Sequence, residues 1–431
     1  MRNTYRWQVI EIDLENKLPH LDAADGYSGV RAIYRLKGRA VGHSDFTLSQ
    51  LPLSPVQVAI AAAHRVAAAV GDRLLNEGFR SALCGLAEPE LAHACETLDE
   101  LIRTTQPLEK FQDAISTDAT GELPSVAIAI CTCKRPRELA RCLESLAALT
   151  ERPREIIVVD NAPEDGTTRE VANRFRNVRY VAEPRPGLSA ARNAALAAAC
   201  SDIVAFTDDD VIVDSDWSAR IRRGFADPQT MVVTGLILPA ELETRAQLIF
   251  EKNLAYFHQG YRARKFDRAY FHALKNKGVH TWAIGAGANM AIRRRAFALG
   301  FRFDTRLGPG VFGGCGEDSE YWYRLLAGGW QCAYDPSAIV YHYHRRDLGS
   351  LRVQMKQYMK GHVASLILQY KTFGDRGNLR RLLVGLPAHY VLLLLRTIAG
   401  GLALEDRVEL SGLIGAIAGL GFIFAPAEER R

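Results

Sequence analysis

The sequence predicts an α/β protein whose central part is a parallel sheet wound with right-handed crossovers. Short apolar runs alternate with amphipathic stretches between residues 125 and 210, which is the pattern of buried strands joined by helices. Polar residues directly follow several of these runs, where a strand would leave the sheet. The chain before and after this region lacks the alternation. We therefore expect one additional region before the α/β part of the chain and one after it.

The length of the chain indicates more than one hydrophobic core, because 431 residues exceed an ordinary domain. We expect a small N-terminal α+β accessory domain at 1–122, the α/β domain at 123–345 and a helical region at 346–431. An apolar content of 48% and a charged content of 24% are typical of a folded protein.

Charge and cysteine content exclude several classes of protein. The net charge is +5 and the basic residues are scattered without interleaved aromatic residues, which argues against a nucleic-acid partner. The eight cysteines occur without an apolar signal segment at the start, which favours reduced thiols in the cytosol. Cys131 and Cys133 form a C-x-C pair, but no second pair stands at zinc-finger spacing.

The first 122 residues predict a few strands, a hairpin and helices. The segments RWQVIEIDL and VRAIYRLKGRAVGHSDFTL show near alternation of apolar and polar residues, and a helix should begin near Pro55. A second helix is expected at Leu91–Thr105, followed by a polar linker to Pro124. The histidines here are isolated, which is typical of structural residues.

The central elements follow in regular order. The first strand ends in the turn CTCKRP, which lacks G-x-G-x-x-G and so argues against a dinucleotide-binding enzyme. The expected elements are the strand VAIAIC, a helix at about Pro136–Ala148, the strand EIIVVD, a helix at about Thr168–Phe175, the strand VRYVAE, the helix LSAARNAALAAAC and a strand from Ile203 to Phe206.

Each of these strands ends in groups suited to a nucleotide. Thr132 offers a hydroxyl, Arg135 a planar cation for phosphate, and Asp160 an acceptor for the imide N–H of a uracil-like base. Arg185 and Arg192 are able to meet phosphate bidentately, and Gly187 allows close backbone approach at a helix N-terminus. Singly, each has a structural explanation, such as a helix cap or a surface cation.

Three adjacent carboxylates, Asp208, Asp209 and Asp210, follow the last of these strands. Ligands in open α/β sheets gather beyond the carboxyl ends of such strands. Adjacent like charges repel unless solvent or a cation neutralises them, and hard cations such as Mg²⁺ or Mn²⁺ prefer carboxylate oxygens. The alternatives are a metal site and a solvated acidic turn.

Several motifs in one order carry a family resemblance. They are CTCKRP, VVDNAPED, EPRPGLSAARNAAL, VAFTDDDV, TGLILPAELETRAQ, GAGANMAIRR and GGCGEDSEYWYRLLAGGW, spread over Ser125–His344. Together they resemble a family 2 glycosyltransferase of the GT-A fold. The resemblance implies that Asp208–Asp210 is the D-x-D metal motif and that Asp160 with the Thr132 turn forms the base pocket. It also implies inversion at the anomeric carbon. The neighbouring Asn161 and Asp209 are further candidates for contact with the substrate.

Sugar transfer requires a cation and a base. Departure of a nucleoside diphosphate builds negative charge, which a divalent cation (Mn²⁺ or Mg²⁺) would stabilise. Asp210 would hold this cation, with Asp208 either behind it or bonded to the ribose. The acceptor hydroxyl must lose a proton as it attacks. We expect Asp318 to be this base and Glu317 to orient it or contact the acceptor. The alternative is that both acids only complement a helix N-terminus.

Further candidates lie around these carboxylates. Gly287 would let a sugar lie close, Asn289 would bond a sugar hydroxyl, and Trp282 would stack on the sugar or be a buried aromatic residue. His342 and His344 lie two residues apart, and either is a candidate metal or diphosphate ligand or a structural residue.

The last 86 residues predict membrane attachment. A helical segment with a basic face, LRVQMKQYMKGHVASLILQY, precedes two apolar stretches, Leu382–Leu404 and Leu410–Ala425. Basic residues flank the pair, which fits a hairpin with both ends cytoplasmic. The alternatives are interfacial helices, and a soluble helical cap or dimer contact.

The sequence thus predicts a metal-dependent inverting glycosyltransferase at the cytoplasmic side of the inner membrane. Its donor would be a nucleoside-diphosphate sugar, with uridine as the expected base, and its acceptor a lipid-linked glycan or polysaccharide. A non-catalytic nucleotide-sugar scaffold or sensor is the alternative from another class. A nucleotidyltransferase is a third possibility, because it too combines an α/β sheet with metal-binding carboxylates.

Overall fold

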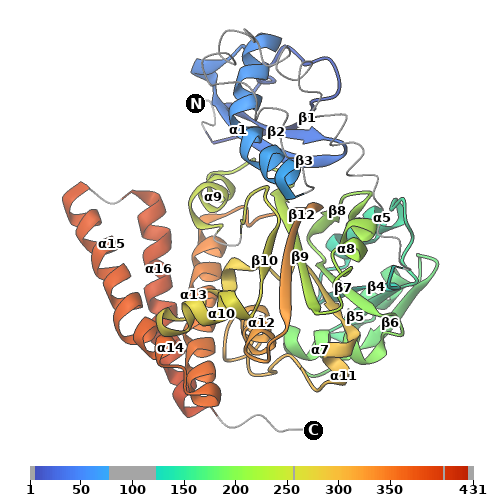
Figure 1. Cartoon of the computed structure of the whole chain (residues 1–431), viewed down its shortest axis with the longest axis vertical. Helices are drawn as coiled ribbons and strands as arrows, with labels where there is room; N and C mark the ends of the chain where they lie inside the picture. The colour runs from blue at the N-terminus through green and yellow to red at the C-terminus, as the bar shows by residue number, and fades with distance from the viewer. Residues whose placement is uncertain (1–4, 77–122, 256–257, 401–402, 426–431) are drawn as a thin grey trace. The chain divides into compact units, whose positions relative to one another are not determined.

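The computed structural model describes residues 5–76, 123–255, 258–400 and 403–425. Contacts divide the chain into two compact units (Figure 1), of which the first comprises Met1–Leu123 with Gly260–Arg262 and the second the remaining residues. The expected helix at Leu91–Thr105 lies outside the described residues, and so does most of the polar linker.

The first unit is a three-stranded sheet covered by one helix. The strands are β1 (Trp7–Asp13), β2 (Gly29–Leu36) and β3 (Arg39–Thr47), and the helix is α1 (Pro55–Asn76). β1 runs parallel to β2, and β2 and β3 form an antiparallel hairpin. Alternate apolar residues of β2 pack against the apolar face of α1, which explains the near alternation in the sequence. The predicted strands, hairpin and start of α1 are confirmed.

The second unit is built on a nine-stranded sheet, half of which is parallel. β7 (Ile203–Asp208), β4 (Val126–Thr132), β5 (Glu155–Asp160) and β6 (Val178–Ala182) lie side by side in that order and run in one direction. The strand order reverses between β4 and β7, the place where open α/β sheets bind ligands. The predicted α/β alternation is confirmed; the connecting helices are α5 (Pro136–Ala147), α6 (Thr167–Ala172) and α7 (Leu188–Ala198).

The rest of the sheet is mixed, beyond the strands from which the parallel sheet was predicted. β11 (Asn289–Arg293) runs antiparallel to β7 and to β9 (Thr230–Pro239), and β12 (Gln331–His342) runs parallel to β9. The first residue of β11 pairs with Thr207, at the carboxyl end of β7. The chain therefore enters β11 from the ligand-binding edge and must run away from it. The short strands β8 (Val211–Val213) and β10 (Arg264–Phe266) are antiparallel to β12.

Helices cover both faces of this sheet (Figure 1). Alternate residues of β4 point to opposite sides, so Ala127 packs in one cluster with α7 and Ile128 in another with α5. The first cluster contains three consecutive buried aromatic residues of α12 (Glu317–Ala327). The second contains Trp217 of α8 (Trp217–Arg223). Three short helices complete the unit: α9 (Arg245–Ile249), α10 (Arg268–Leu274) and α11 (Arg294–Ala298).

Four helices end the chain and belong to the same unit. They are α13 (Leu348–Phe373), α14 (Arg376–Arg380), α15 (Leu386–Gly400) and α16 (Leu404–Leu420), with a π turn, Arg381–Gly385, before α15. The wider turn accommodates Pro387, which has no N–H to donate to the preceding turn.

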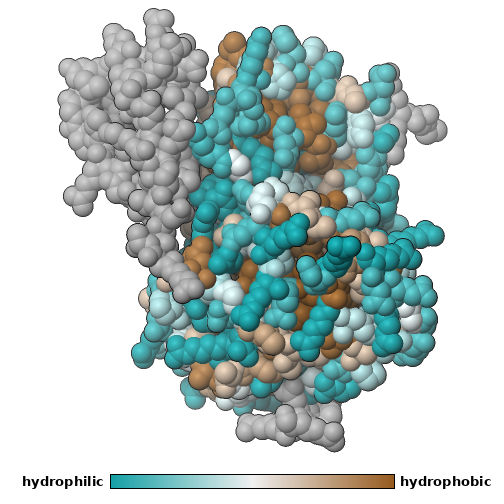
Figure 2. All heavy atoms as spheres, turned by 90° about the vertical axis from the view of Figure 1, so that its right-hand side faces the viewer, coloured by the Kyte–Doolittle hydropathy of each residue, from teal (hydrophilic) through white to brown (hydrophobic). Residues whose placement is uncertain are grey.

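The last two helical segments have the length and composition of membrane spans. These segments, Arg376–Arg396 and Leu404–Phe424, are 22% and 39% buried in the structure. On α15, Leu392, Leu395 and Ile398 are exposed. By contrast, hydrophilic side chains cover most of the face of this unit that carries α5 and β6 (Figure 2).

Candidate active site

A cavity of about 1260 Å³ opens at the carboxyl ends of β4 and β7. Its wall is formed by the ends of these strands, the loop before β11, the N-terminus of α12 and one side of α13. Of the residues predicted for the site, it includes Thr132, Arg135, Asn161, Gly187, Arg192, Asp208, Asp209, Asp210, Trp282, Gly287, Glu317, Asp318 and His342. Segments far apart in the sequence thus meet at one place.

The three adjacent aspartates are not equivalent. Asp209 accepts hydrogen bonds from the Thr132 hydroxyl (2.7 Å) and from Arg135 Nη1 (2.5 Å). Burial raises the pKa of Asp209 to about 7, although the Arg135 guanidinium beside it opposes this shift. Arg135 Nη2 also donates to Asp210 at 3.0 Å. Asp209 therefore anchors Thr132 and Arg135 at the strand ends, a role that the sequence did not reveal.

Asp208 and Asp210 come together with His342. One ligand atom from each of the three lies within 4.8 Å of the others. The pairing of β8 with β12 places His342 opposite Val211, directly beside the aspartates. Burial alone would raise the pKa of Asp210, but His342, Arg135 and Arg345 hold it well below its usual range. Burial would lower the pKa of His342, but Asp210, at 3.2 Å from Nε2, raises it.

A chain of hydrogen bonds fixes the ring of His342 from behind. His342 Nδ1 lies 3.1 Å from Nδ1 of His344, whose Nε2 lies 3.1 Å from Oε2 of Glu251. A carboxylate only accepts, so His344 carries its proton on Nε2 and presents a bare Nδ1. His342 must then donate from Nδ1, and its Nε2 also donates, to Asp210 Oδ1 at 3.2 Å; this Nε2 would have to lose its proton to ligate a cation. Of the two histidines, His342 thus faces the carboxylates and His344 supports it.

These residues fit a divalent cation. Two carboxylate oxygens and one imidazole nitrogen form a donor set that Mn²⁺ accepts readily, and a ligating imidazole with a partner on its other nitrogen is the usual arrangement. Burial raises the pKa of Asp208, which disfavours its charged form unless a cation lies beside it. A side-chain exposure of 34% keeps Asp208 open to the cavity.

Asp318 stands at the N-terminus of α12, across the cavity from the strand ends. Its Oδ2 accepts a hydrogen bond from the backbone N–H of Gly287 (2.9 Å), and its Oδ1 accepts one from Ser319 (2.6 Å). Burial, followed by the charge of Glu317, raises the pKa of Asp318 to about 6. A carboxylate with this pKa is a stronger base than an exposed one and is still ionised at neutral pH.

Glu317 and Arg192 form a buried ion pair instead of facing substrate. Arg192 Nη1 donates to Glu317 Oε1 at 2.7 Å, and the side chains are 3% and 5% exposed. The other oxygen of Glu317 accepts from the backbone of Gly316 at 3.0 Å. This corrects two predictions, because Glu317 is not free to contact an acceptor and Arg192 is not free to contact phosphate. A Cβ at Gly287 would lie 2.3 Å from Arg192, so this pair requires glycine there.

Besides His344, three predicted residues lie outside the cavity wall. Asn289 is fully buried; it accepts from Trp217 Nε1 and donates to the carbonyls of Leu236 and Ala338, so it does not contact a sugar. Asp160 is also buried and accepts from Ala162 N–H and the Tyr180 hydroxyl. Arg185 is 69% exposed and pairs with Glu183.

The loop that carries Gly187 is held by Asn161. The amide of Asn161 donates to the carbonyls of Glu183 and Arg185, and its oxygen accepts from Gly187 N–H at 2.9 Å. Asn161 thus fastens this loop to the end of β5, while it also lines the cavity.

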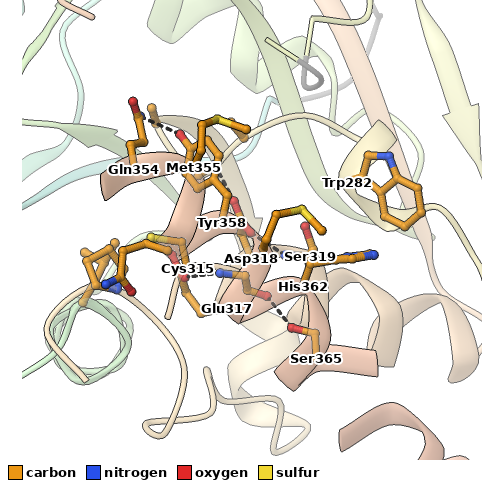
Figure 3. A pocket seen from close by; sticks show the side chains of 18 of the residues that line it. Trp282, Cys315, Glu317, Asp318, Ser319, Gln354, Met355, Tyr358, His362 and Ser365 are labelled. Atoms are coloured by element: carbon orange, nitrogen blue, oxygen red, sulfur yellow. Dashed lines mark hydrogen bonds between the residues drawn. The ribbon is translucent and has the colours of Figure 1, made fainter. Parts of the chain in front are cut away.

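Helix α13 forms one wall of the site. From its sequence, we expected this helix to lie at a lipid surface instead. Its residues Tyr358, His362 and Ser365 line the cavity, and Ser365 points toward the loop before α12 (Figure 3). Ser365 Oγ donates to the Gly316 carbonyl at 3.2 Å. A Cβ at Gly361 would lie 1.5 Å from the Cys315 carbonyl oxygen, so only glycine permits this approach. A glycine inside an otherwise helical pattern was the available indication.

Comparison with known proteins agrees with the resemblance inferred from the motifs. The succinoglycan biosynthesis protein ExoM of Rhizobium meliloti is 29% identical over 272 residues, which covers 59% of this chain and 79% of that protein. The solved structure of the mannosyltransferase PcManGT from Pyrobaculum calidifontis, in complex with GDP-Man and Mn²⁺, is 18% identical; the match covers 72% of this chain and 90% of that one, with a TM-score of 0.47.

A second solved structure is more distant. It is glucosyl-3-phosphoglycerate synthase from Mycobacterium tuberculosis in complex with Mn²⁺, UDP and glucosyl-3-phosphoglycerate, which is 17% identical over 55% of this chain and 78% of that one, with a TM-score of 0.38. Finally, residues 127–300 match the model of the family described as glycosyl transferase family 2.

Proposed function

We propose, from the membership of residues 127–300 in glycosyl transferase family 2, that this glycosyltransferase is metal-dependent and inverting. Its donor would be a nucleoside-diphosphate sugar with uridine as the base, and its acceptor a lipid-linked glycan or a polysaccharide. The observation that carries the proposal is the meeting of Asp208, Asp210 and His342 in the same cavity as Asp318.

Asp208, Asp210 and His342 would hold Mn²⁺ or Mg²⁺ at the end of β7. When bound, the cation would neutralise the charge that develops on the departing nucleoside diphosphate. Arg345 lies 3.8 Å from Asp210 and is 45% exposed, so it is free to turn toward a diphosphate. Arg135, which is 32% exposed, holds Asp209 and Asp210 in place.

Asp318 would accept the proton of the acceptor hydroxyl. The backbone N–H groups of Gly287 and Ser319 hold its carboxylate in one orientation, so that little reorganisation accompanies proton transfer. Its pKa of about 6 keeps it ionised at pH 7 and makes it more basic than an ordinary aspartate. Inversion is what the family resemblance implies, and a role for Asp318 as base, with Asp208 and Asp210 assigned to the cation, is consistent with it.

The acceptor class follows from the C-terminal helices. The cavity continues from Asp318 past α13 to Leu386, His389 and Tyr390 at the start of α15. This helix belongs to a segment apolar enough to span a membrane. An acceptor attached to a lipid would reach Asp318 along this path, and we place the reaction at the cytoplasmic side of the inner membrane, where nucleotide sugars are made.

The test is donor consumption by the purified full-length protein with Mn²⁺ or Mg²⁺ and a panel of nucleotide sugars. We expect one member to be hydrolysed or transferred with release of a nucleoside diphosphate. Asp210→Ala should remove metal-dependent nucleotide binding, whereas Asp318→Asn should keep binding and lose transfer. Full turnover by Asp318→Asn would reject the assigned base. Release of pyrophosphate would instead indicate a nucleotidyltransferase.

A further inference from the structure

One cluster in the cavity has no part in the chemistry described above. Arg381, the first residue of the π turn before α15, lies against Trp282 and two histidines. Its guanidinium carbon is 4.0 Å from the centre of the Trp282 ring. Arg381 Nε donates to His362 Nε2 at 3.1 Å, and Nη1 lies 3.4 Å from His280 Nε2. The two imidazole rings in turn contact Trp282, with centroids at 4.6 and 4.9 Å.

The charge of Arg381 is not compensated within the described chain. Among residues 5–76, 123–255, 258–400 and 403–425, no carboxylate forms an ion pair with it. Both imidazoles accept from a cation through Nε2, so both must be neutral. Burial lowers the pKa of His362 to about 3, with Arg381 contributing, and also lowers that of His280. A partly buried cation with only neutral partners favours an anion.

The position of the cluster points to the kind of anion. Trp282, His362 and Arg381 line the same cavity as Asp318, and the His362 side chain points from α13 toward Trp282 (Figure 3). The cavity then continues to Gly385, Leu386 and Tyr390. Beyond it the apolar residues of α15 are exposed. Arg381 lies near the start of the apolar segment Arg376–Arg396, at the depth where a spanning helix would meet lipid headgroups.

We propose that Arg381, His362 and Trp282, supported by His280, bind the phosphate of an amphiphilic acceptor whose apolar chain lies along α15. The guanidinium would meet phosphate oxygens with its remaining N–H groups, while the two neutral imidazoles hold it in place. Trp282 would hold the guanidinium plane in place. This inference rests on the proposed function, since it identifies the acceptor of the same cavity, and it gives Trp282 a role other than stacking on a sugar.

The experiment measures binding of dodecyl phosphate to the full-length protein by calorimetry in dodecyl maltoside, a neutral amphiphile with the same chain. The wild type should bind dodecyl phosphate, and inorganic phosphate should bind about tenfold more weakly or worse because it lacks the chain. Arg381→Gln should weaken dodecyl phosphate binding by about tenfold or more, because charge-assisted bonds to phosphate are lost. The control is Arg380→Gln, which removes an exposed neighbour outside the cavity and should bind like the wild type.

Several outcomes would overturn the inference. The first is that the wild type binds no dodecyl phosphate. The second is that Arg381→Gln binds dodecyl phosphate as tightly as Arg380→Gln does. The third is that inorganic phosphate binds as well as dodecyl phosphate, which would indicate a free phosphate ligand. Loss of UDP and Mn²⁺ binding in Arg381→Gln would assign the cluster to the donor. The comparison of dodecyl phosphate with inorganic phosphate on the wild type tests the inference even if a variant does not fold. Failure of the proposed function would look different, since dodecyl phosphate would still bind while no nucleotide sugar is consumed.

Discussion

Glu317→Gln should destabilise the catalytic unit strongly, because it leaves the guanidinium of Arg192 buried without its partner. The two side chains are 5% and 3% exposed and meet at 2.7 Å. Charges about 4 Å apart interact by about 4 kcal/mol at an effective dielectric constant of about 20. Attraction between Arg192 and Asp208, whose Oδ1 lies 3.9 Å from Arg192 Nη2, should offset part of this lost interaction energy. We therefore expect a loss of about 3 kcal/mol, at the lower end of values for breaking buried pairs.

The assay is thermal unfolding followed by circular dichroism. A loss of about 3 kcal/mol should lower the Tm of a unit of this size by roughly 6 °C. The matched control is Asp227→Asn, which breaks the pair of Asp227 with Lys265 at 3.0 Å, where the side chains are 40% and 54% exposed. Exposed pairs contribute about 1 kcal/mol or less, so this variant should melt within about 2 °C of the wild type. Equal Tm values for the two variants would refute the assignment of a structural ion pair.

Four further predictions concern the site itself. Asp318 must be deprotonated to act as base, and its pKa is about 6. The value of kcat/KM should therefore fall about tenfold per pH unit below pH 6 and level off above pH 6. A flat profile from pH 5 to 8 would exclude Asp318 as the base. Asp210→Ala should abolish Mn²⁺ binding in a calorimetric titration, and a bound stoichiometry of one would contradict the site. Glu251→Ala should weaken Mn²⁺ binding by about tenfold or more, because the tautomer of His342 is no longer fixed; unchanged affinity would show that the hydrogen-bond chain is not needed. Gly361→Ala should impair transfer and lower the Tm, since its Cβ would overlap the Cys315 carbonyl, and wild-type values for both would refute the packing argument.

The sequence predicted the parallel half of the sheet well because the information there is local. β4, β5 and β7 are short and largely buried runs, the edge strand β6 is a short run of partly exposed residues, and helices connect them in regular order. The direction of β11 and β12 was not predictable in the same way. It depends on which edge of the sheet the long loops occupy, and neither apolar periodicity nor propensity contains that information.

The site shows the same division between local and distant information. Residues at strand ends, such as Thr132 and Asp208, were predictable because parallel strands bring their carboxyl ends to one edge. The pairing of Arg192 with Glu317, and of Asn289 with Trp217, joins residues far apart in the chain. A polar residue that is saturated by a distant partner has the same sequence pattern as one that awaits a ligand. The contribution of α13 was missed for this reason too, because its apolar and basic pattern was equally typical of a membrane surface.

Three consecutive carboxylates can serve two purposes because their side chains have different partners. Asp209 is turned to Thr132 and Arg135, and its partners are inside the protein. Asp208 and Asp210 instead converge with His342. Arg135 contacts both Asp209 and Asp210. Asp209 therefore positions the Arg135 guanidinium, which helps to keep Asp210 ionised. The acidic triplet therefore contains both a candidate metal site and part of its support, which explains why a strand end with three like charges is stable before any cation binds.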